Sequence, residues 1–426
     1  MYTCPHCIHP FRTEQVFDNH LPDCSKHVYQ ITKYPTPDKT SLKWKAREKT
    51  ARLSFAMYAD FESCLVPVDG DGDVVDDHVP AVAVLAGRRG MTPGPRLFGR
   101  QHVDPQSHPI RNDAIFLIAS ITKPIVVMGA MRLIERGQLS LNDRVADFFP
   151  EFGRKGKYGT TIRNLMTHTS GLPDMLPNNV ELRKSKATLA DFVSETCAIT
   201  PDFPPGRSVQ YQSMGTAVLA AITEQVSGMT CGEFLRQEFF RPLAMNDTRL
   251  GAPEDWFTGP QPTIDRIAEI RVPEEQATET DWNWNSRYWR QLGAPWGGLL
   301  TTPLDLGQFA QLMLNRGRAG DQQILSAATI DASTENQLAS MKDVPDEDRR
   351  FRPWGLGWRL QWPGHTNTFG DLVSARTFGH WGATGTLLWI DPEREAFALI
   401  LSTQPLDPRG APFQRLSNAI VASFTT

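Results

Sequence analysis

The chain has 426 residues, of which 40% are hydrophobic and 9% aromatic, and its formal net charge at pH 7 is −4. This length allows two or three globular domains, and the small negative charge excludes a chain-wide basic surface for nucleic acid or an anionic membrane. No apolar run approaches the roughly 18 residues that a membrane-spanning helix needs, and the first residues lack the charged-then-apolar layout of a secretory signal. We therefore expect a cytoplasmic protein without a membrane partner.

Residues 1–27 carry metal-ligand side chains at specific spacing. Two residues separate Cys4 from Cys7, and His20 and Cys24 lie one helical turn apart farther along. Four nitrogen and sulfur ligands in this pattern are typical of structural zinc, so we predict a zinc site at these four residues. The segment resembles a zinc finger of the C2H2 type whose last histidine is replaced by cysteine. Because so short a segment cannot fold without the metal, the alternative is an unfolded tail with reduced cysteines.

Residues 28–74 are predicted to be a polymerase-like fragment and linker. The first half is basic and poor in apolar residues, and an apolar stretch then ends in Asp60 and Glu62. With the finger, about the first 68 residues resemble the start of a transposon-type, protein-primed family B DNA polymerase, where these carboxylates would match the first exonuclease motif. The other motifs of that enzyme are missing, so we expect a relic, a fusion or a gene-model error without polymerase activity. An Asp and Gly cluster at residues 69–77 marks the boundary.

The third predicted domain, residues 75–426, reads as ordinary globular material. An apolar run at residues 79–85 is typical of a buried strand, and residues 96–99 form a possible second strand. Helical periodicity follows over residues 121–134, 188–196, 214–227 and 231–240. Strands return late, at residues 386–390 and 396–401, before a terminal helix at residues 412–424.

A serine and a lysine three residues apart, Ser120 and Lys123, stand at the start of the helix predicted over residues 121–134. Pro124 is tolerated in a first helical turn, where its missing N–H has no partner to lose. On this reading Lys123 lies on the same face as Ser120, and the helix start offers backbone N–H groups to an oxyanion. The pattern predicts an activated serine; the alternative, on this motif alone, is an exposed serine and lysine on an amphipathic helix.

Two further patterns each occur once and follow in order. Tyr211 and Ser213 form a Tyr-x-Ser pattern in a loop before the helical pattern at residues 214–227. His380 and Gly382 form a His-x-Gly pattern that leads into the late strands. Taken alone, each residue is more often structural than catalytic, and the order of the three patterns carries the functional interpretation.

With these motifs, about residues 79–424 resemble the serine beta-lactamase and penicillin-binding protein superfamily, in its class C-like branch of esterases, carboxypeptidases and amidases. The resemblance implies an α/β (α+β) fold: an antiparallel sheet flanked by helices, with an inserted all-helical domain, here preceded by a small zinc-finger-like segment. It places Ser120 in the cleft between sheet and helical domain.

The resemblance also implies roles for individual residues. Ser120 would attack an ester or amide carbonyl to give an acyl-enzyme, and Lys123, with a lowered pKa, would share in its deprotonation. Tyr211 would pass the proton to the leaving group and then activate the deacylating water. The oxyanion hole would be the backbone N–H groups of Ser120 and Ala383, beside Gly382.

Two positions depart from the lactamase pattern. His380 stands where many relatives carry lysine, so we expect a weaker, pH-dependent positive contact for a substrate carboxylate. Ser213 replaces the common asparagine. Both changes favour esters over antibiotics.

We therefore expect a carboxylesterase-like serine hydrolase with a small-molecule ester or amide substrate, no cofactor for hydrolysis and a possible structural zinc. The alternatives are a D-amino-acid peptidase or carboxypeptidase, a weak beta-lactamase, and a nucleic-acid-binding zinc-finger protein with a silent hydrolase fold. The charges of the finger nearly cancel, so we expect no nucleic-acid partner. His168 is expected to be structural. Five aromatic residues could wall an acyl pocket or pack as a lid or core: Trp282, Trp284, Tyr288, Trp289 and Trp296.

Overall fold

The computed structural model describes residues 2–3, 10–11, 79–362, 369–405 and 411–424. Contacts divide the chain into two units, and the larger spans Val79–Phe424. In the other unit, β1 (Tyr2–Thr3) pairs antiparallel with β2 (Pro10–Phe11). The ligands of the predicted zinc site and the two polymerase-like carboxylates lie outside the described residues: Cys4, Cys7, His20, Cys24, Asp60 and Glu62. The finger and the polymerase-like fragment therefore stay predictions.

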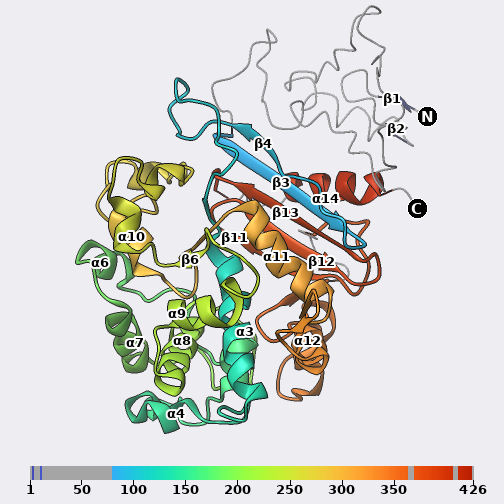
Figure 1. Cartoon of the computed structure of the whole chain (residues 1–426). Helices are drawn as coiled ribbons and strands as arrows, with labels where there is room; N and C mark the ends of the chain where they lie inside the picture. The colour runs from blue at the N-terminus through green and yellow to red at the C-terminus, as the bar shows by residue number, and fades with distance from the viewer. Residues whose placement is uncertain (1, 4–9, 12–78, 363–368, 406–410, 425–426) are drawn as a thin grey trace, which may run out of the picture. The chain divides into compact units, whose positions relative to one another are not determined.

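A six-stranded antiparallel sheet organises the larger unit (Figure 1). Its order is β10-β11-β12-β13-β3-β4, and every neighbouring pair is antiparallel. The beginning and the end of the unit join where β13 pairs with β3, with Leu399 opposite Leu85. The strands are β3 (Ala81–Arg88), β4 (Arg96–Gly99), β10 (Arg359–Leu360), β11 (Phe378–Gly382), β12 (Thr386–Asp391) and β13 (Ala396–Ser402).

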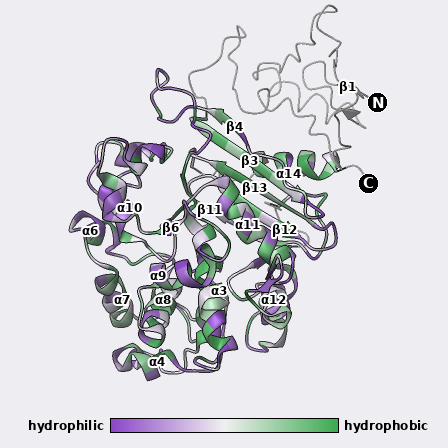
Figure 2. Ribbon diagram, viewed as in Figure 1, coloured by the Kyte–Doolittle hydropathy of each residue, from purple (hydrophilic) through white to green (hydrophobic). Residues whose placement is uncertain are grey.

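Helices cover both faces of this sheet. On one face α11 (Pro303–Leu314) packs against β3, β12 and β13. On the other face α14 (Ala411–Ser423) lies over the sheet, and Trp389 Nε1 donates to Ser417 Oγ at 3.1 Å. Successive side chains of a strand point to opposite faces, and here both faces are covered by helices. The strands β12 and β13 are therefore buried along their whole length. The late strands are accordingly continuous apolar runs, which Figure 2 shows in green.

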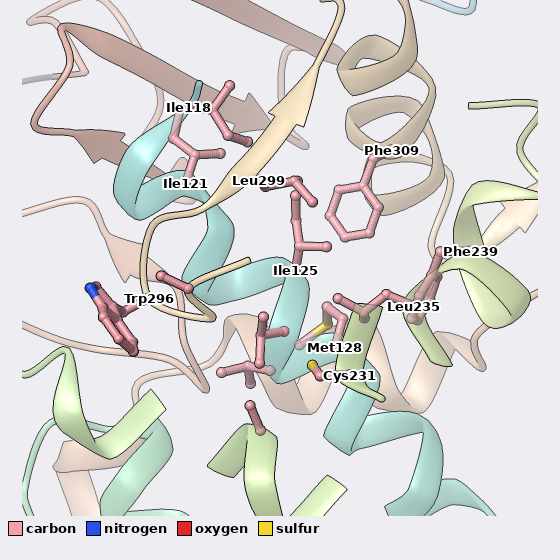
Figure 3. Close-up of a cluster of buried hydrophobic side chains, with 14 of the residues drawn as sticks. Ile118, Ile121, Ile125, Met128, Cys231, Leu235, Phe239, Trp296, Leu299 and Phe309 are labelled. Atoms are coloured by element: carbon pink, nitrogen blue, oxygen red, sulfur yellow. The ribbon is translucent and has the colours of Figure 1, made fainter. Parts of the chain in front are cut away.

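The helical part lies between β4 and β10 in the chain and is organised around α3 (Thr122–Glu135). This helix packs against α8 (Met214–Ser227) and α9 (Cys231–Leu235), and most of its residues are buried. Figure 3 shows Ile125 and Met128 of α3 lying toward the side chain of Leu235. A helix surrounded on most sides by other elements needs apolar residues on most of its surface, as α3 has.

The remaining elements are short. The helices are α4 (Val145–Phe148), α5 (Ile162–Met166), α6 (Asn179–Lys184), α7 (Leu189–Ala198), α10 (Arg287–Leu292), α12 (Ala327–Thr334) and α13 (Asp346–Phe351). A second sheet has the order β5-β7-β6, from β5 (Phe116–Leu117), β7 (Leu299–Thr301) and β6 (Arg249–Leu250), and β8 (Arg318–Ala319) pairs with β9 (Gln322–Gln323). The 3-10 turns are η2 (Ala119–Ile121), η3 (Pro150–Gly153), η5 (Glu254–Phe257), η6 (Thr263–Arg266), η7 (Glu274–Gln276) and η8 (Gln337–Ser340).

The architecture confirms the predicted antiparallel sheet flanked by helices, with a helical insertion. One element differs from its prediction: the helical pattern at residues 231–240 is α-helical only to Leu235, and Arg236–Phe240 continues as a π-helical turn. Among the described residues, no helix is both long and apolar enough to cross a bilayer.

Candidate active site

Ser120 lies in η2, at the junction between β5 and α3. The preceding residue, Ala119, has φ +44°, a left-handed conformation that a residue with a Cβ rarely adopts. Such a conformation persists only where the surrounding structure holds it. Here Thr384 Oγ1 donates to the Leu117 carbonyl at 2.8 Å, and Thr386 Oγ1 donates to the Ile118 carbonyl at 2.9 Å. The buried hydroxyls of Thr384 and Thr386 therefore hold the backbone that leads into Ser120.

Lys123 reaches back over the first turn of α3 to Ser120. Its Nζ lies 2.8 Å from Ser120 Oγ and also donates to the Trp296 carbonyl at 2.8 Å. The side chain is 1% exposed, and this burial lowers the pKa of Lys123 from 10.5 to about 7, while the nearby Asp174 carboxylate acts in the opposite direction. Near neutral pH a substantial fraction of the amine is uncharged, and an uncharged amine at this distance can accept the Ser120 proton.

Tyr211 lies in the loop before α8, beside Lys123. Its hydroxyl is close enough to Ser120 for the serine to act on its pKa, and Lys123 Nζ lies 4.8 Å from the centroid of its ring. Burial raises the pKa of Tyr211 above its ordinary value, so the hydroxyl is protonated at neutral pH. Tyr211 can therefore donate a proton to a leaving group, whereas Lys123 is the better acceptor for the proton of the serine.

The end of β11 comes close to the segment before Ser120. A Cβ on Gly382 would lie 2.4 Å from the Ile118 carbonyl oxygen and 3.0 Å from the Ala119 Cβ, a separation that only glycine allows without a shift. Ala383, the next residue, is exposed at the surface of the site. The strand end and η2 thus place the two predicted oxyanion-hole residues, Ser120 and Ala383, on touching segments.

His380 lies in β11 and is fully buried. Its Nδ1–H donates to the Trp381 carbonyl at 2.7 Å, which leaves Nε2 unprotonated and without a hydrogen-bond partner. Burial, and next the charge of Lys123, lower the pKa of His380 to about 3. The imidazole is therefore neutral at physiological pH, which corrects the expectation of a pH-dependent positive contact for a substrate carboxylate.

An aromatic stack supports the two motif residues. Trp381 stacks on His380, with ring centroids 5.2 Å apart, and on Tyr211 at 6.2 Å. His168 packs 4.9 Å from the Tyr211 ring and 4.3 Å from Trp354, and its Nδ1 accepts the Gln212 backbone N–H at 3.2 Å. His168 thus braces the loop that carries Tyr211, in keeping with the structural role expected for it.

The family model described as Beta-lactamase matches residues 66–422 of this chain. The chain belongs to the beta-lactamase family. It is 28% identical over 332 residues to the "Putative D-alanyl-D-alanine carboxypeptidase" of Salmonella typhimurium, an alignment that covers 72% of this chain and 73% of that protein.

Solved structures of the same fold include a penicillin-binding protein homologue from Caulobacter crescentus, with TM-score 0.64 and 23% identity over 80% of this chain and 92% of that one. Another is EstCE1, a hydrolase with promiscuous acyltransferase activity, with TM-score 0.64 and 18% identity over 80% and 94% of the two chains. A family VIII carboxylesterase matches with TM-score 0.63 and 20% identity over 80% and 91%. At these identities the structures establish the shared fold.

In this beta-lactamase family member, the serine of the Tyr-x-Ser pattern is hydrogen-bonded to a carboxylate. Ser213 Oγ donates to Asp174 Oδ1 at 2.6 Å, and the Ser213 backbone N–H donates to the Asp174 carbonyl at 3.2 Å. Ser213 is buried, whereas Asp174 is exposed. Asp174 stands in a loop and belongs to no distinguishing sequence pattern, so only the fold shows that it contacts Ser213.

The tryptophan-rich segment packs mainly as part of the protein interior. Arg183 lies between two of its rings, 4.8 Å from the centroid of Trp282 and 4.4 Å from that of Trp289, and donates to the Trp282 carbonyl at 2.9 Å. Trp296 packs on Trp289 and Phe192, and contacts the site through its backbone carbonyl on Lys123. These contacts favour the packing interpretation over an acyl pocket.

In the part of the chain that the structure describes, no group of three or more His, Cys, Asp and Glu side chains gathers in a way that could hold a metal ion.

Proposed function

We propose that this protein is a carboxylesterase-like serine hydrolase that cleaves small-molecule esters through an acyl-enzyme, with Ser120 as nucleophile. The observation that carries the proposal is the contact of 2.8 Å between Lys123 Nζ and Ser120 Oγ, made by a buried amine with a pKa of about 7. A serine hydroxyl is a weak nucleophile until a base accepts its proton, and this amine is such a base at neutral pH. Serine hydrolases of the beta-lactamase family need no cofactor.

In the acylation step, Ser120 Oγ attacks the ester carbonyl carbon while its proton moves to Lys123 Nζ. The backbone N–H groups of Ser120 and Ala383 stabilise the negative charge that develops on the carbonyl oxygen. The C–O bond to the alcohol then breaks, and the Tyr211 hydroxyl donates its proton to the departing oxygen. Tyr211 regains a proton from Lys123, so the base is neutral again when the acyl-enzyme has formed.

In the deacylation step a water molecule takes the place of the alcohol. Tyr211 and Lys123 together accept a proton from the water as its oxygen attacks the acyl carbon, and the proton returns to Ser120 Oγ as the acyl bond breaks. Because the pKa of Tyr211 is raised, the phenol acts as a relay to Lys123 rather than as a free phenolate.

The neutral His380 supports esters as the preferred substrates. A carboxypeptidase or a lactamase binds a substrate that carries a carboxylate, and an imidazole with a pKa of about 3 offers no positive charge to it. The second candidate is a D-amino-acid peptidase or carboxypeptidase, which the similarity to the Salmonella protein favours. A weak beta-lactamase belongs to the same alternative, because its substrate also carries a carboxylate.

Steady-state kinetics with Ser120→Ala test the proposal. On 4-nitrophenyl butyrate we expect kcat/KM to fall by about a thousandfold or more, because the variant keeps the oxyanion donors but loses the nucleophile. Ser185→Ala, an exposed serine outside the site, is the matched control and should keep the full rate. The unmodified protein should cleave an acyl-D-alanyl-D-alanine peptide and benzylpenicillin far more slowly than the ester. An active Ser120→Ala enzyme would refute the proposal, and faster peptide cleavage would favour the peptidase.

A further inference from the structure

A carboxylate lies beside the proposed catalytic residues without a role in the steps above. Asp174 belongs to the loop between α5 and α6, and two hydrogen bonds to Ser213 fix it next to the Tyr211 motif: the side-chain contact of 2.6 Å and the backbone contact of 3.2 Å. Only one of its side-chain oxygens, Oδ1, is used by Ser213. The hydrogen bonds hold the carboxylate in place. Because the residue is exposed, a substrate can still reach it.

Within the described residues, Asp174 makes no salt bridge. Its charge nevertheless acts on both Lys123 and Tyr211, and it raises the pKa of each of these groups. A charge that acts on both the base and the phenol of the site also acts on a group bound close to the scissile carbonyl.

The other ionisable groups of the site are buried. Burial lowers the pKa of both His168 and His380, so both imidazoles are neutral. Arg359 is 3% exposed and lies 4.4 Å from the centroid of the Trp381 ring, so this cation is buried and does not meet a substrate directly. Lys123 is engaged with Ser120 and Trp296, and its pKa of about 7 leaves it partly uncharged near neutral pH before the reaction begins.

We propose that Asp174 selects substrates by charge, favouring acyl groups that carry an ammonium close to the scissile carbonyl and disfavouring those that carry an anion. The substrate class is then an ester or amide of a cationic acid. This inference rests on the proposed hydrolase function and adds a preference to it. A fixed carboxylate a few ångströms from a substrate charge, in a partly solvated site, changes the relative rate by about tenfold for each sign of charge.

The test uses three 4-nitrophenyl esters of matched shape, cleaved by the full-length protein. The acyl groups are 4-(trimethylammonio)butanoyl, its neutral isostere 5,5-dimethylhexanoyl, and 4-sulfobutanoyl. Each kcat/KM is divided by that of the neutral ester, so any change in Lys123 reactivity cancels. In Asp174→Asn we expect the cation-to-neutral ratio to fall about tenfold and the anion-to-neutral ratio to rise about tenfold. Asp281→Asn, which removes an 82% exposed carboxylate elsewhere, should leave both ratios unchanged.

Two further measurements keep the test decisive if Asp174→Asn is poorly folded. Asp174→Glu retains the charge and should retain the preference, and 1 M NaCl should reduce the preference of the unmodified protein by screening. Unchanged ratios in Asp174→Asn, with the neutral ester still cleaved through Ser120, would overturn this inference alone. No cleavage of the neutral ester by the unmodified protein would overturn the proposed function, and this inference with it.

Discussion

Lys123 is the residue whose protonation state controls the reactivity of Ser120. Its burial is nearly complete, and its two hydrogen-bond partners are an uncharged hydroxyl and a backbone carbonyl. Neither partner supplies a full negative charge, so desolvation dominates and lowers the pKa to about 7. A lysine on the same helical face in water would remain charged and could not act as a base.

The pKa of Lys123 predicts the pH dependence of ester hydrolysis. The neutral amine is the reactive form, so kcat/KM should rise with pH through about 7 and level off above it. His380 should add no second step above pH 5, because its pKa is about 3. A pH profile with 4-nitrophenyl butyrate between pH 5.5 and 9, corrected for spontaneous hydrolysis, measures this. A rate that is flat across that range would contradict the assigned role of Lys123.

Sequence patterns found the residues that act by their own chemistry and missed those that act through the fold. Ser120, Lys123 and Tyr211 stand in short motifs, and the structure brings the three together. The charge state of His380 could not be predicted, because it depends on complete burial in β11. Asp174 could not be found either, because its neighbour Ser213 is 39 residues away in the sequence.

At the scale of elements, the site depends on how closely β11 approaches η2. Gly382 ends the strand against the Ile118 carbonyl, and Thr386, at the start of β12, donates to the same carbonyl. These contacts link the last third of the chain to the residue before Ala119. The position of the oxyanion donors is therefore set by the sheet as much as by the helix that carries Ser120.

Gly382→Ala should move β11 away from η2, because the new Cβ would lie 2.4 Å from the Ile118 carbonyl oxygen. We expect kcat for 4-nitrophenyl butyrate to fall by about 10²-fold, the loss typical of one oxyanion donor. Gly159→Ala, where a Cβ meets nothing within 4 Å, is the control and should keep its rate. Normal turnover in Gly382→Ala would show that the strand end does not position the oxyanion donors.

Long, regular elements were predicted well from sequence, and so was the four-residue β4, whereas the strands of two or three residues were not. The late strands and the helices α3 and α8 agree with their predicted ranges to within one residue, because their apolar patterns are long. The second sheet, made of β5, β7 and β6, has strands of only two or three residues and no periodicity to detect. However, β5 directly precedes the 3-10 turn that contains Ser120.

At the scale of the whole molecule, every residue of the proposed site belongs to the unit Val79–Phe424. The fold class and the family could be predicted because the three motifs and their order are specific, and the match over residues 66–422 confirms the family. The preferred substrate does not follow from these motifs, because the charge at the site depends on burial and on Asp174. Zinc binding and the nucleic-acid alternative concern residues outside the described part of the chain and stay predictions.

Removing residues 1–68 should leave ester hydrolysis within about twofold of the full-length rate, because all the proposed site residues lie in the larger unit. Kinetics on both proteins, with thermal melting as a check of folding, measure this. The zinc content of the full-length protein should approach one ion and fall to zero in the truncated form. A truncated protein that folds and has lost its activity would mean that the first segment takes part in hydrolysis.

The most direct test of the central claim is covalent labelling of the full-length protein with a serine-directed phosphonate, followed by intact mass measurement and peptide mapping. A nucleophile activated by Lys123 should give a single adduct on Ser120, and labelling should stop ester turnover in proportion to its extent. Lys123→Ala should label far more slowly, because the base is gone. A folded protein that gives no adduct, or an adduct on another serine, would contradict the account.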